Sequence, residues 1–202
     1  MEGQRFNYYG IYRDYRDLYV PLLGPHQITN AGTALLTLEV LSRAGVEVTE
    51  PAVRAGLART RWPARLEVLG LNPALVLDVA HNVDGAQALA CSIKQLFPGQ
   101  KIILIIAMLA DKEREKVMSI LGPLARKVVV TKPLSPRAGA WEFLAGEAKK
   151  YVSDVVVCED ISEAIEEGLR SVDITEVVLI TGSFYMVSYA RELLLTACRF
   201  KK

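Results

Sequence analysis

The chain has 202 residues, with 24 lysines and arginines against 23 aspartates and glutamates, so its formal net charge is +1. A charge this close to zero gives no basic footprint for nucleic acid or for a membrane surface, and we predict neither partner. Hydrophobic residues make up 51% of the sequence, which is globular composition with enough chain for a sizeable core. The uncharged run of residues 177–190 is too short to cross a bilayer.

The N-terminal residues and the cysteines together predict a cytoplasmic protein. The first residues mix aromatic and charged side chains and contain no apolar signal core, so we expect no secretion signal. The cysteines Cys91, Cys158 and Cys198 lie far apart, a spacing that builds neither a zinc site nor a disulfide framework. This usage suits a reducing compartment.

The first part of the chain predicts strands followed by two helices. Residues 1–24 alternate aromatic and charged side chains, which is typical of short, half-buried strands. Apolar residues from Ala31 to Leu41 then recur at helical spacing, and Gly45 can stand just past the end of that helix. Thr49 is expected to cap a second, short helix.

Beyond residue 60, five apolar runs alternate with five segments of helical spacing. The predicted strands are 75–79, 101–108, 127–131, 154–159 and 176–182. The predicted helices are 84–96, 112–121, 140–150, 162–171 and 185–197. Continuous valine and isoleucine runs indicate strands buried on both faces, and this alternation predicts a doubly wound, mostly parallel, Rossmann-like α/β sheet. We therefore divide the chain into residues 1–60 and an α/β domain of residues 61–202.

Ligands of such sheets bind outside the carboxyl ends of the strands, so the loops there are the candidate ligand-binding segments. The sequence contains no G-x-G-x-x-G fingerprint, no G-x-x-x-x-G-K-[ST] phosphate loop and no G-x-S-x-G elbow. Their absence argues against the common α/β dehydrogenases and hydrolases and excludes a self-sufficient P-loop ATPase.

The segment D-V-A-H-N-V-D-G follows the first buried strand and offers two candidate ligand contacts. Asp78 can accept hydrogen bonds from vicinal hydroxyls such as those of a ribose, and His81 can donate to a phosphate or carboxylate at the next helix N-terminus. The alternative is structural, with Asp78 and Asn82 capping the turn and His81 packed nearby.

Three further polar segments carry weaker signals. Asn30 lies one turn after His26 at the entry to the first helix, where polar side chains usually act as caps. Arg65 offers a planar fork suited to phosphate oxygens but can equally be a surface residue. Ser183, between the last strand and the last helix, can bind a carboxylate or simply cap the helix. The charged residues of the segments Asp111-Lys112 and Pro136-Arg137 can belong to loop ion pairs that contribute little.

The order of these segments is more informative than any one of them. HQ-x-x-NA, RWP-x-R, LD-x-AHN-x-DG, DK, PRA and TGS-x-Y follow one another over residues 23–195, and this order resembles the folylpolyglutamate synthase/dihydrofolate synthase family of the Mur ligase superfamily. That resemblance implies an ATP- and Mg²⁺-dependent ligase that phosphorylates a folate carboxylate and joins it to glutamate. It implies nucleotide contacts at Asn30, Arg65 and Asp78, a catalytic and substrate-binding role for His81, and glutamate binding at Ser183.

The sequence departs from the family pattern in two ways. Val79 stands where the family usually has glycine, and the half that carries the phosphate loop and the metal ligands is missing. By resemblance, residues 1–60 are the tail of the central ATPase domain, and a missing N-terminal ATPase domain is the expected partner. We expect the chain to be inactive alone. A Mur-type peptidoglycan ligase domain and a non-catalytic nucleotide- or partner-binding module remain the alternatives, and dihydrofolate synthesis stays open.

Overall fold

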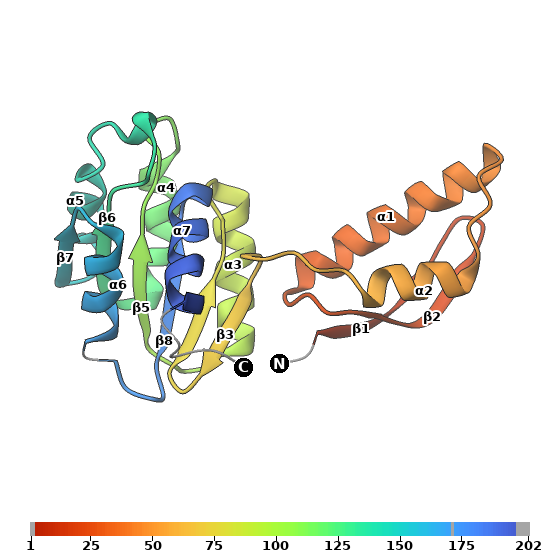
Figure 1. The fold of residues 1–202 in the computed structure, drawn as a ribbon, viewed down its shortest axis with the longest axis horizontal. Coiled ribbons are helices and arrows are strands. Elements are labelled where there is room, and N and C mark those ends of the chain that lie inside the picture. Colours follow the sequence, from red (N-terminus) through yellow and green to blue (C-terminus); the bar gives the residue numbers. More distant parts are fainter. Residues whose placement is uncertain (1–2, 171, 197–202) are drawn as a thin grey trace. The chain divides into compact units, whose positions relative to one another are not determined.

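The computed structural model describes residues 3–170 and 172–196, and the chain divides into two compact units, Met1–Pro63 and Ala64–Lys202 (Figure 1). The first unit is built from a hairpin and two helices. Its elements are β1 (Gln4–Tyr9), β2 (Asp14–Val20), α1 (Pro25–Arg43) and α2 (Glu50–Ala58). The two strands pair antiparallel, and a cluster formed by Tyr15, Leu18, Leu35 and Val53 fills the space between hairpin and helices.

The predicted end of α1 is confirmed, but the buried face of this helix differs from the predicted apolar pattern. The helix begins at Pro25, because Gly24 adopts φ 91° and forms its N-cap. Gly45 has φ 92° just past the C-cap, as predicted. Leu41 is 41% exposed, contrary to the prediction, whereas Glu39 is buried. The predicted cap of α2 is confirmed, since Thr49 Oγ1 accepts a hydrogen bond from the backbone of Ala52.

The second unit contains a six-stranded sheet in the order β3-β4-β8-β5-β6-β7. The strands are β3 (Glu67–Leu71), β4 (Ala74–Leu77), β5 (Ile102–Ile106), β6 (Ala125–Thr131), β7 (Asp154–Cys158) and β8 (Val177–Thr181). The helices are α3 (Val83–Leu96), α4 (Arg114–Leu121), α5 (Phe143–Ala148), α6 (Ile161–Leu169) and α7 (Phe184–Thr196), with two short 3₁₀ turns at Gly122–Leu124 and Pro136–Ala138. All strand pairs are parallel except β3 with β4. Helices α6 and α7 cover one face of the sheet, and α3, α4 and α5 cover the other (Figure 1).

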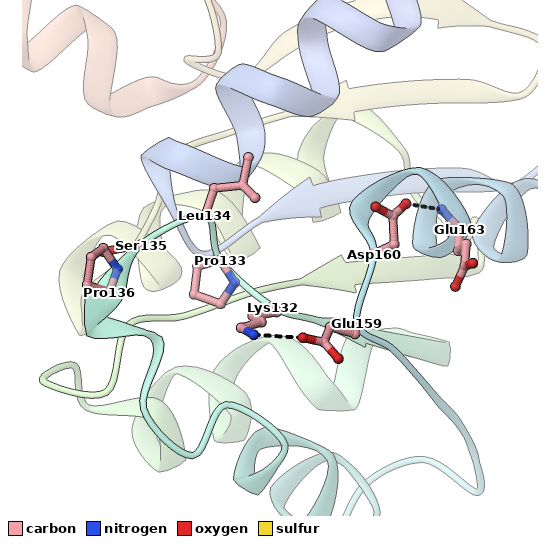
Figure 2. A pocket seen from close by; sticks show the side chains of 8 residues that line it. All are labelled: Lys132, Pro133, Leu134, Ser135, Pro136, Glu159, Asp160 and Glu163. Carbon is pink, nitrogen blue, oxygen red and sulfur yellow. Dashed lines mark hydrogen bonds and ion pairs between the residues drawn. The ribbon is translucent and has the colours of Figure 1, made fainter.

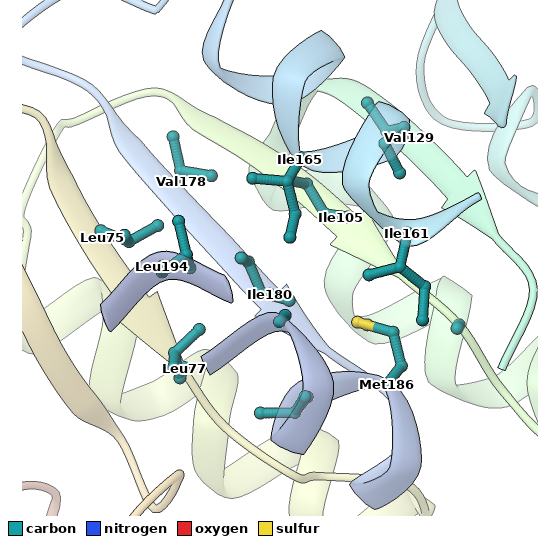
Figure 3. Close-up of a cluster of buried hydrophobic side chains, with 14 of the residues drawn as sticks. Leu75, Leu77, Ile105, Val129, Ile161, Ile165, Val178, Ile180, Met186 and Leu194 are labelled. Carbon is teal, nitrogen blue, oxygen red and sulfur yellow. The ribbon is translucent and has the colours of Figure 1, made fainter. Parts of the chain in front are cut away.

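The core of this unit explains why the apolar runs become strands. β4, β5 and β8 are buried along their whole length, and their side chains meet residues of α6 and α7 such as Ile165, Met186 and Leu194 (Figure 3). A strand covered by helices on both faces must be apolar throughout, which is the pattern in the sequence. The edge strand β7 differs from this expectation, because Val157 is 46% exposed.

The doubly wound α/β sheet predicted from the sequence is therefore confirmed, with one strand more than expected. β3 was missed because its residues, EVLGL, include a charge and a glycine and show no buried run. The predicted ends of two helices, at residues 171 and 197, and Cys198 lie outside the described residues. Across the described part of the chain, none of the helices combines the length and the apolar character that crossing a membrane requires.

Candidate functional site

The sheet order creates a crevice where β8 lies between β4 and β5. The loops after β4 and β5 lead to α3 and α4 on one face, whereas the loop after β8 leads to α7 on the other face. Loops that leave neighbouring parallel strands in opposite directions open a space at their carboxyl ends, which is where ligands of such sheets bind.

A cavity of about 160 Å³ occupies this place. Its lining comes from the loops after four different strands: His81, Leu109, Lys112, Arg137, Gly182, Ser183, Phe184 and Tyr185. Two of the five residues assigned from the sequence, His81 and Ser183, are thus brought together here, although they are far apart in the sequence. Lys112 and Arg137, noted there only as members of loop pairs, join them.

Ser183 lies at the junction of β8 and α7 with its hydroxyl group unused. The residue is 2% exposed, and its Oγ has no hydrogen-bond partner in the structure. The capping alternative is therefore not realised. Gly182 holds the turn at φ 103°, and a Cβ there would lie 2.4 Å from the carbonyl oxygen of Ala107. A buried, unpaired hydroxyl costs about 1–3 kcal/mol, which is a cost that a bound ligand would relieve.

His81 stands half-buried at the entrance to α3. Its Nδ1 lies 3.0 Å from the carbonyl oxygen of Val79, an acceptor that favours the tautomer with hydrogen on Nδ1. That tautomer leaves Nε2 able to accept a hydrogen bond or a proton. The N-cap of α3 is Asn82, whose Oδ1 accepts a hydrogen bond from the backbone N–H of Gly85 at 2.9 Å.

Two cations give the cavity a positive charge. Lys112 Nζ and Arg137 Nη1 lie 3.8 and 3.6 Å from the same oxygen of Asp111, and none of the three side chains is buried. The single carboxylate of Asp111 is therefore shared by two cations, each at long distance. Such exposed pairs contribute little stability, which leaves the cations available for an anionic ligand.

Asp78 and Arg65 belong to a second, neighbouring arrangement. The Asp78 carboxylate is 6% exposed and accepts from the backbone N–H groups of Leu66 and Ala80, both at 2.8 Å. Ala64 and Leu66, on either side of Arg65, have φ values of 58° and 49°. Non-glycine residues in this left-handed region are strained, and such strain persists only where surrounding contacts impose it.

Glu67 supplies the other contacts that hold this strained segment. One of its oxygens accepts from the backbone of Ala64 at 2.8 Å, and Arg191 on α7 binds both oxygens at 2.7 and 2.8 Å. Burial raises the pKa of the Glu67 carboxyl, but the hydrogen bonds from Arg191 and Ala64 outweigh it and lower the pKa overall. No local pattern in the sequence marks this pair, because its members are 124 positions apart.

Val79, the departure from the family pattern, is accommodated in the core. Its side chain is 4% exposed within the main hydrophobic cluster, and its backbone N–H bonds the carbonyl oxygen of Ala64 at 3.1 Å. Val79 is not among the residues with positive φ, so a β-branched side chain fits here without backbone strain.

Asn30 lies in the first unit, on the second turn of α1. Its Nδ2 donates to Gln27 Oε1 at 3.2 Å, and Gln27 Nε2 lies 3.1 Å from His26 Nε2. The expectation that a side chain caps this helix is wrong, because no side-chain cap is formed at Gly24. The three polar residues instead form a chain of contacts along the start of the helix.

A wider groove of about 770 Å³ lies at the carboxyl ends of β6 and β7 (Figure 2). Its principal polar groups already bind one another. Lys132 Nζ pairs with Glu159 at 2.7 Å, and Asp160 caps α6 through the backbone N–H groups of Ser162 and Glu163. The smaller cavity is the better candidate site, because it alone of the two contains a buried hydroxyl that lacks a partner. Among residues 3–170 and 172–196, no group of three or more histidine, cysteine or acidic side chains is placed to hold a metal ion.

Comparison with known proteins places the fold of the second unit in a family. The model of the Mur ligase glutamate ligase domain matches residues 64–184, more than half of the chain. The chain therefore belongs to the Mur ligase family through its glutamate ligase domain.

Three similar proteins all carry the name folylpolyglutamate synthase. The chain is 31% identical over 191 residues to the dihydrofolate synthase/folylpolyglutamate synthase of Bacillus subtilis, covering 94% of this chain and 44% of that protein. The solved structure of Mycobacterium tuberculosis folylpolyglutamate synthase with ADP superposes with a TM-score of 0.87 at 32% identity, covering 95% of this chain and 45% of that one. A Yersinia pestis structure with Mn, AMPPNP and L-glutamate bound matches at TM-score 0.75 and 28% identity, covering 90% of this chain and 42% of that one. The chain thus spans less than half the length of these relatives.

Proposed function

We propose that this chain is the C-terminal part of a cytoplasmic, ATP-dependent ligase that joins glutamate to a folate through an acyl phosphate. The observation that carries the proposal is the cavity at the β8 crevice, where a buried hydroxyl without a partner faces the same space as two cations. The relatives support the folate branch of the family, since those compared above are named folylpolyglutamate synthases.

Glutamate fits this cavity by charge. A dicarboxylate can place one carboxylate against Lys112 and Arg137 and the other against Ser183 Oγ and the free N–H groups at the start of α7. The Yersinia pestis relative is described with L-glutamate bound, which agrees with this class of ligand. Both carboxylates would be held by groups that have no competing short-range partner.

The chemistry of the proposed reaction divides into two steps. The folate carboxylate attacks the γ-phosphorus of ATP, and ADP leaves with the bridging electrons. The glutamate amine then attacks the acyl carbon, inorganic phosphate leaves, and the amine loses a proton. We assign that proton to His81 Nε2, because Nδ1 is already directed to the Val79 carbonyl. His81 also neighbours the incoming glutamate in this arrangement.

The nucleotide contacts are proposed on the strained segment and on the first unit. Arg65 would bind the ATP phosphates, since the segment that presents it is fixed by Asp78 and Glu67. Asp78 would bind the ribose hydroxyl groups through its carboxylate, an acceptor-only group. Asn30 would contact the base. Mg²⁺, when bound, neutralises the transferring phosphate, and we place its ligands on the part of the relatives that this chain does not cover.

The test is to supply that uncovered part. We expect the 202-residue chain to show no ATP turnover alone. Fused behind the uncovered N-terminal part of the Mycobacterium tuberculosis enzyme, it should release ADP only when folate and glutamate are both present. Ligation of another amino acid to a peptidoglycan precursor would indicate the Mur-type alternative. Nucleotide binding without turnover would indicate a binding module.

A further inference from the structure

Arg191 is a charged residue of α7 that the proposed reaction does not use. Its guanidinium donates from Nε and Nη2 to the two carboxylate oxygens of Glu67, at 2.7 and 2.8 Å. Such a two-point contact between planar groups fixes their relative orientation as well as their distance. The helix α7 therefore holds the Glu67 carboxylate in one orientation.

Glu67 in turn fixes the backbone just before Arg65. Its Oε2, which is one of the oxygens bonded to the guanidinium, also accepts from the backbone N–H of Ala64 at 2.8 Å. On the other side of Arg65, Asp78 Oδ2 accepts from the backbone N–H of Leu66 at 2.8 Å. Two carboxylates thus hold the two neighbours of Arg65, and both neighbours have left-handed backbone. Without these contacts, the strain of that conformation favours a different backbone.

Arg65 differs in exposure from the residues on either side of it. Ala64 and Leu66 are 4% and 1% exposed, whereas Arg65 is half-buried. The backbone is thus anchored on both sides of a side chain that reaches the surface. A shift of this short strained segment therefore moves the guanidinium of Arg65.

We infer that Arg191 is a positioning residue, which orients Arg65 toward the ATP phosphates by way of Glu67. The inference rests on the proposed function, which supplies the phosphate contact of Arg65. α7 begins beside the cavity proposed for glutamate, and Arg191 follows Ser183 by about two turns. One helix therefore fixes both the glutamate cavity and the segment that presents Arg65. This spacing matters because misplacing a reacting group by about 1 Å can cost about a hundredfold in rate.

The competing explanation is that the ion pair only stabilises the fold, and a second pair of the same kind separates the two. Arg126 Nη2 donates to Glu176 at 2.6 Å, and the Arg126 side chain is 29% exposed, close to the 31% of Arg191. Glu176 directly precedes β8, whereas Ser183 follows the carboxyl end of that strand. The second pair thus lies at the opposite end of β8 from the cavity, and its loss should affect stability alone.

The test compares Arg191→Ala with Arg126→Ala in the chain fused behind the uncovered part of the Mycobacterium tuberculosis enzyme. We expect Arg191→Ala to lower kcat about tenfold or more, because Arg65 is no longer held in place. The KM for glutamate should change less than about twofold, since the turn at Ser183 is untouched. Arg126→Ala should leave kcat within about twofold. All kinetics are measured well below the Tm of each variant, so that loss of folded protein does not contribute.

A double-mutant cycle shows whether Arg191 acts through Arg65. If it does, Arg191→Ala should lower kcat no further once Arg65 is already alanine, because the group that it positions is gone. The same proportional loss of kcat in both backgrounds overturns the inference. A loss no larger than that of Arg126→Ala overturns it as well, because the ion pair is then only structural.

Hydrogen exchange in the 202-residue chain tests the same contact without catalysis. Arg191→Ala should speed exchange at the backbone N–H groups of Ala64 and Leu66 more than Arg126→Ala does, because the effect is local. Equal exchange in the two variants rejects the positioning role, whether or not the fused enzyme is active. If the unaltered fusion is inactive but exchange responds as expected, the proposed function alone is rejected and the hold of Arg191 on the segment stands.

Discussion

Replacing Glu67 by glutamine tests whether the ion pair with Arg191 holds the segment around Arg65. In the structure one carboxylate serves both the guanidinium of Arg191 and the backbone N–H of Ala64. Glutamine keeps the size of the side chain but loses the charge and one of the two acceptor atoms. Arg191, with 31% of its side chain exposed, is then left without its carboxylate.

The expected loss follows from the kind of contact removed. Charge-assisted hydrogen bonds each contribute about 1.5–3 kcal/mol, and the side chains of Glu67 and Arg191 are 22% and 31% exposed, so water offsets part of that value. We therefore expect Glu67→Gln to lower the free energy of unfolding by about 2–3 kcal/mol. In a chain of this size that corresponds to a fall in Tm of about 5–10 °C.

The assay is thermal unfolding followed by circular dichroism, with a second ion pair as control. Lys132 and Glu159 also lie 2.7 Å apart, but their side chains are 43% and 70% exposed. Glu159→Gln should cost less than about 1 kcal/mol. If Glu67→Gln lowers Tm no more than Glu159→Gln does, the carboxylate does not hold the segment and the argument about Arg65 fails.

Further predictions concern the site, the first unit and the response to acid. Ser183→Ala should raise the KM for glutamate of the fused enzyme at least tenfold while leaving Tm unchanged or higher, because the hydroxyl has no partner to lose; a lower Tm with unchanged KM would contradict the role. Arg65→Ala should cut turnover of the fusion at least a hundredfold, and unchanged kinetics would remove Arg65 from the nucleotide site. The backbone N–H of Ile11 donates to the carboxylate of Glu39, so Glu39→Gln should lower the stability of the first unit by about 1–3 kcal/mol. Hydrogen exchange at Ile11 should become faster, and unchanged exchange would show that this hydrogen bond does not stabilise the unit. The hydrogen bond from Arg126 lowers the pKa of the Glu176 carboxyl despite its burial, so its contribution to folding is present at neutral pH and is lost as the pH falls through the lowered pKa. Urea unfolding that is no easier at pH 3 than at pH 7 would contradict this sign.

The sheet was predictable because burial on both faces leaves a plain pattern in the sequence. Runs such as those of β5 and β8 must be apolar throughout when helices cover both sides, and turns mark their ends. β3 was not predictable in the same way, since it is an antiparallel edge strand whose first residue, Glu67, is charged. The inward position of Glu39 also did not follow from the pattern, because one oxygen of its carboxylate accepts hydrogen bonds from backbone N–H groups of a distant loop.

The site was only partly visible in the sequence. His81 and Ser183 stood at the carboxyl ends of predicted strands, so the parallel sheet itself placed them in one cavity. The bond between Glu67 and Arg191 joins residues that no local spacing connects. Likewise, nothing in the sequence marked Ala64 and Leu66 as residues with left-handed backbone, because this conformation is imposed by contacts from elsewhere in the fold.

Glutamate-dependent ADP release by the fused enzyme tests the central claim most directly. With ATP and a folate present, adding L-glutamate should start ADP release and lengthen the folate by glutamate, and Ser183→Ala should shift the glutamate concentration required upward. If a folded fusion whose nucleotide site binds ATP neither releases ADP nor lengthens the folate on addition of glutamate, the cavity at β8 is not a glutamate site and the proposed function is wrong.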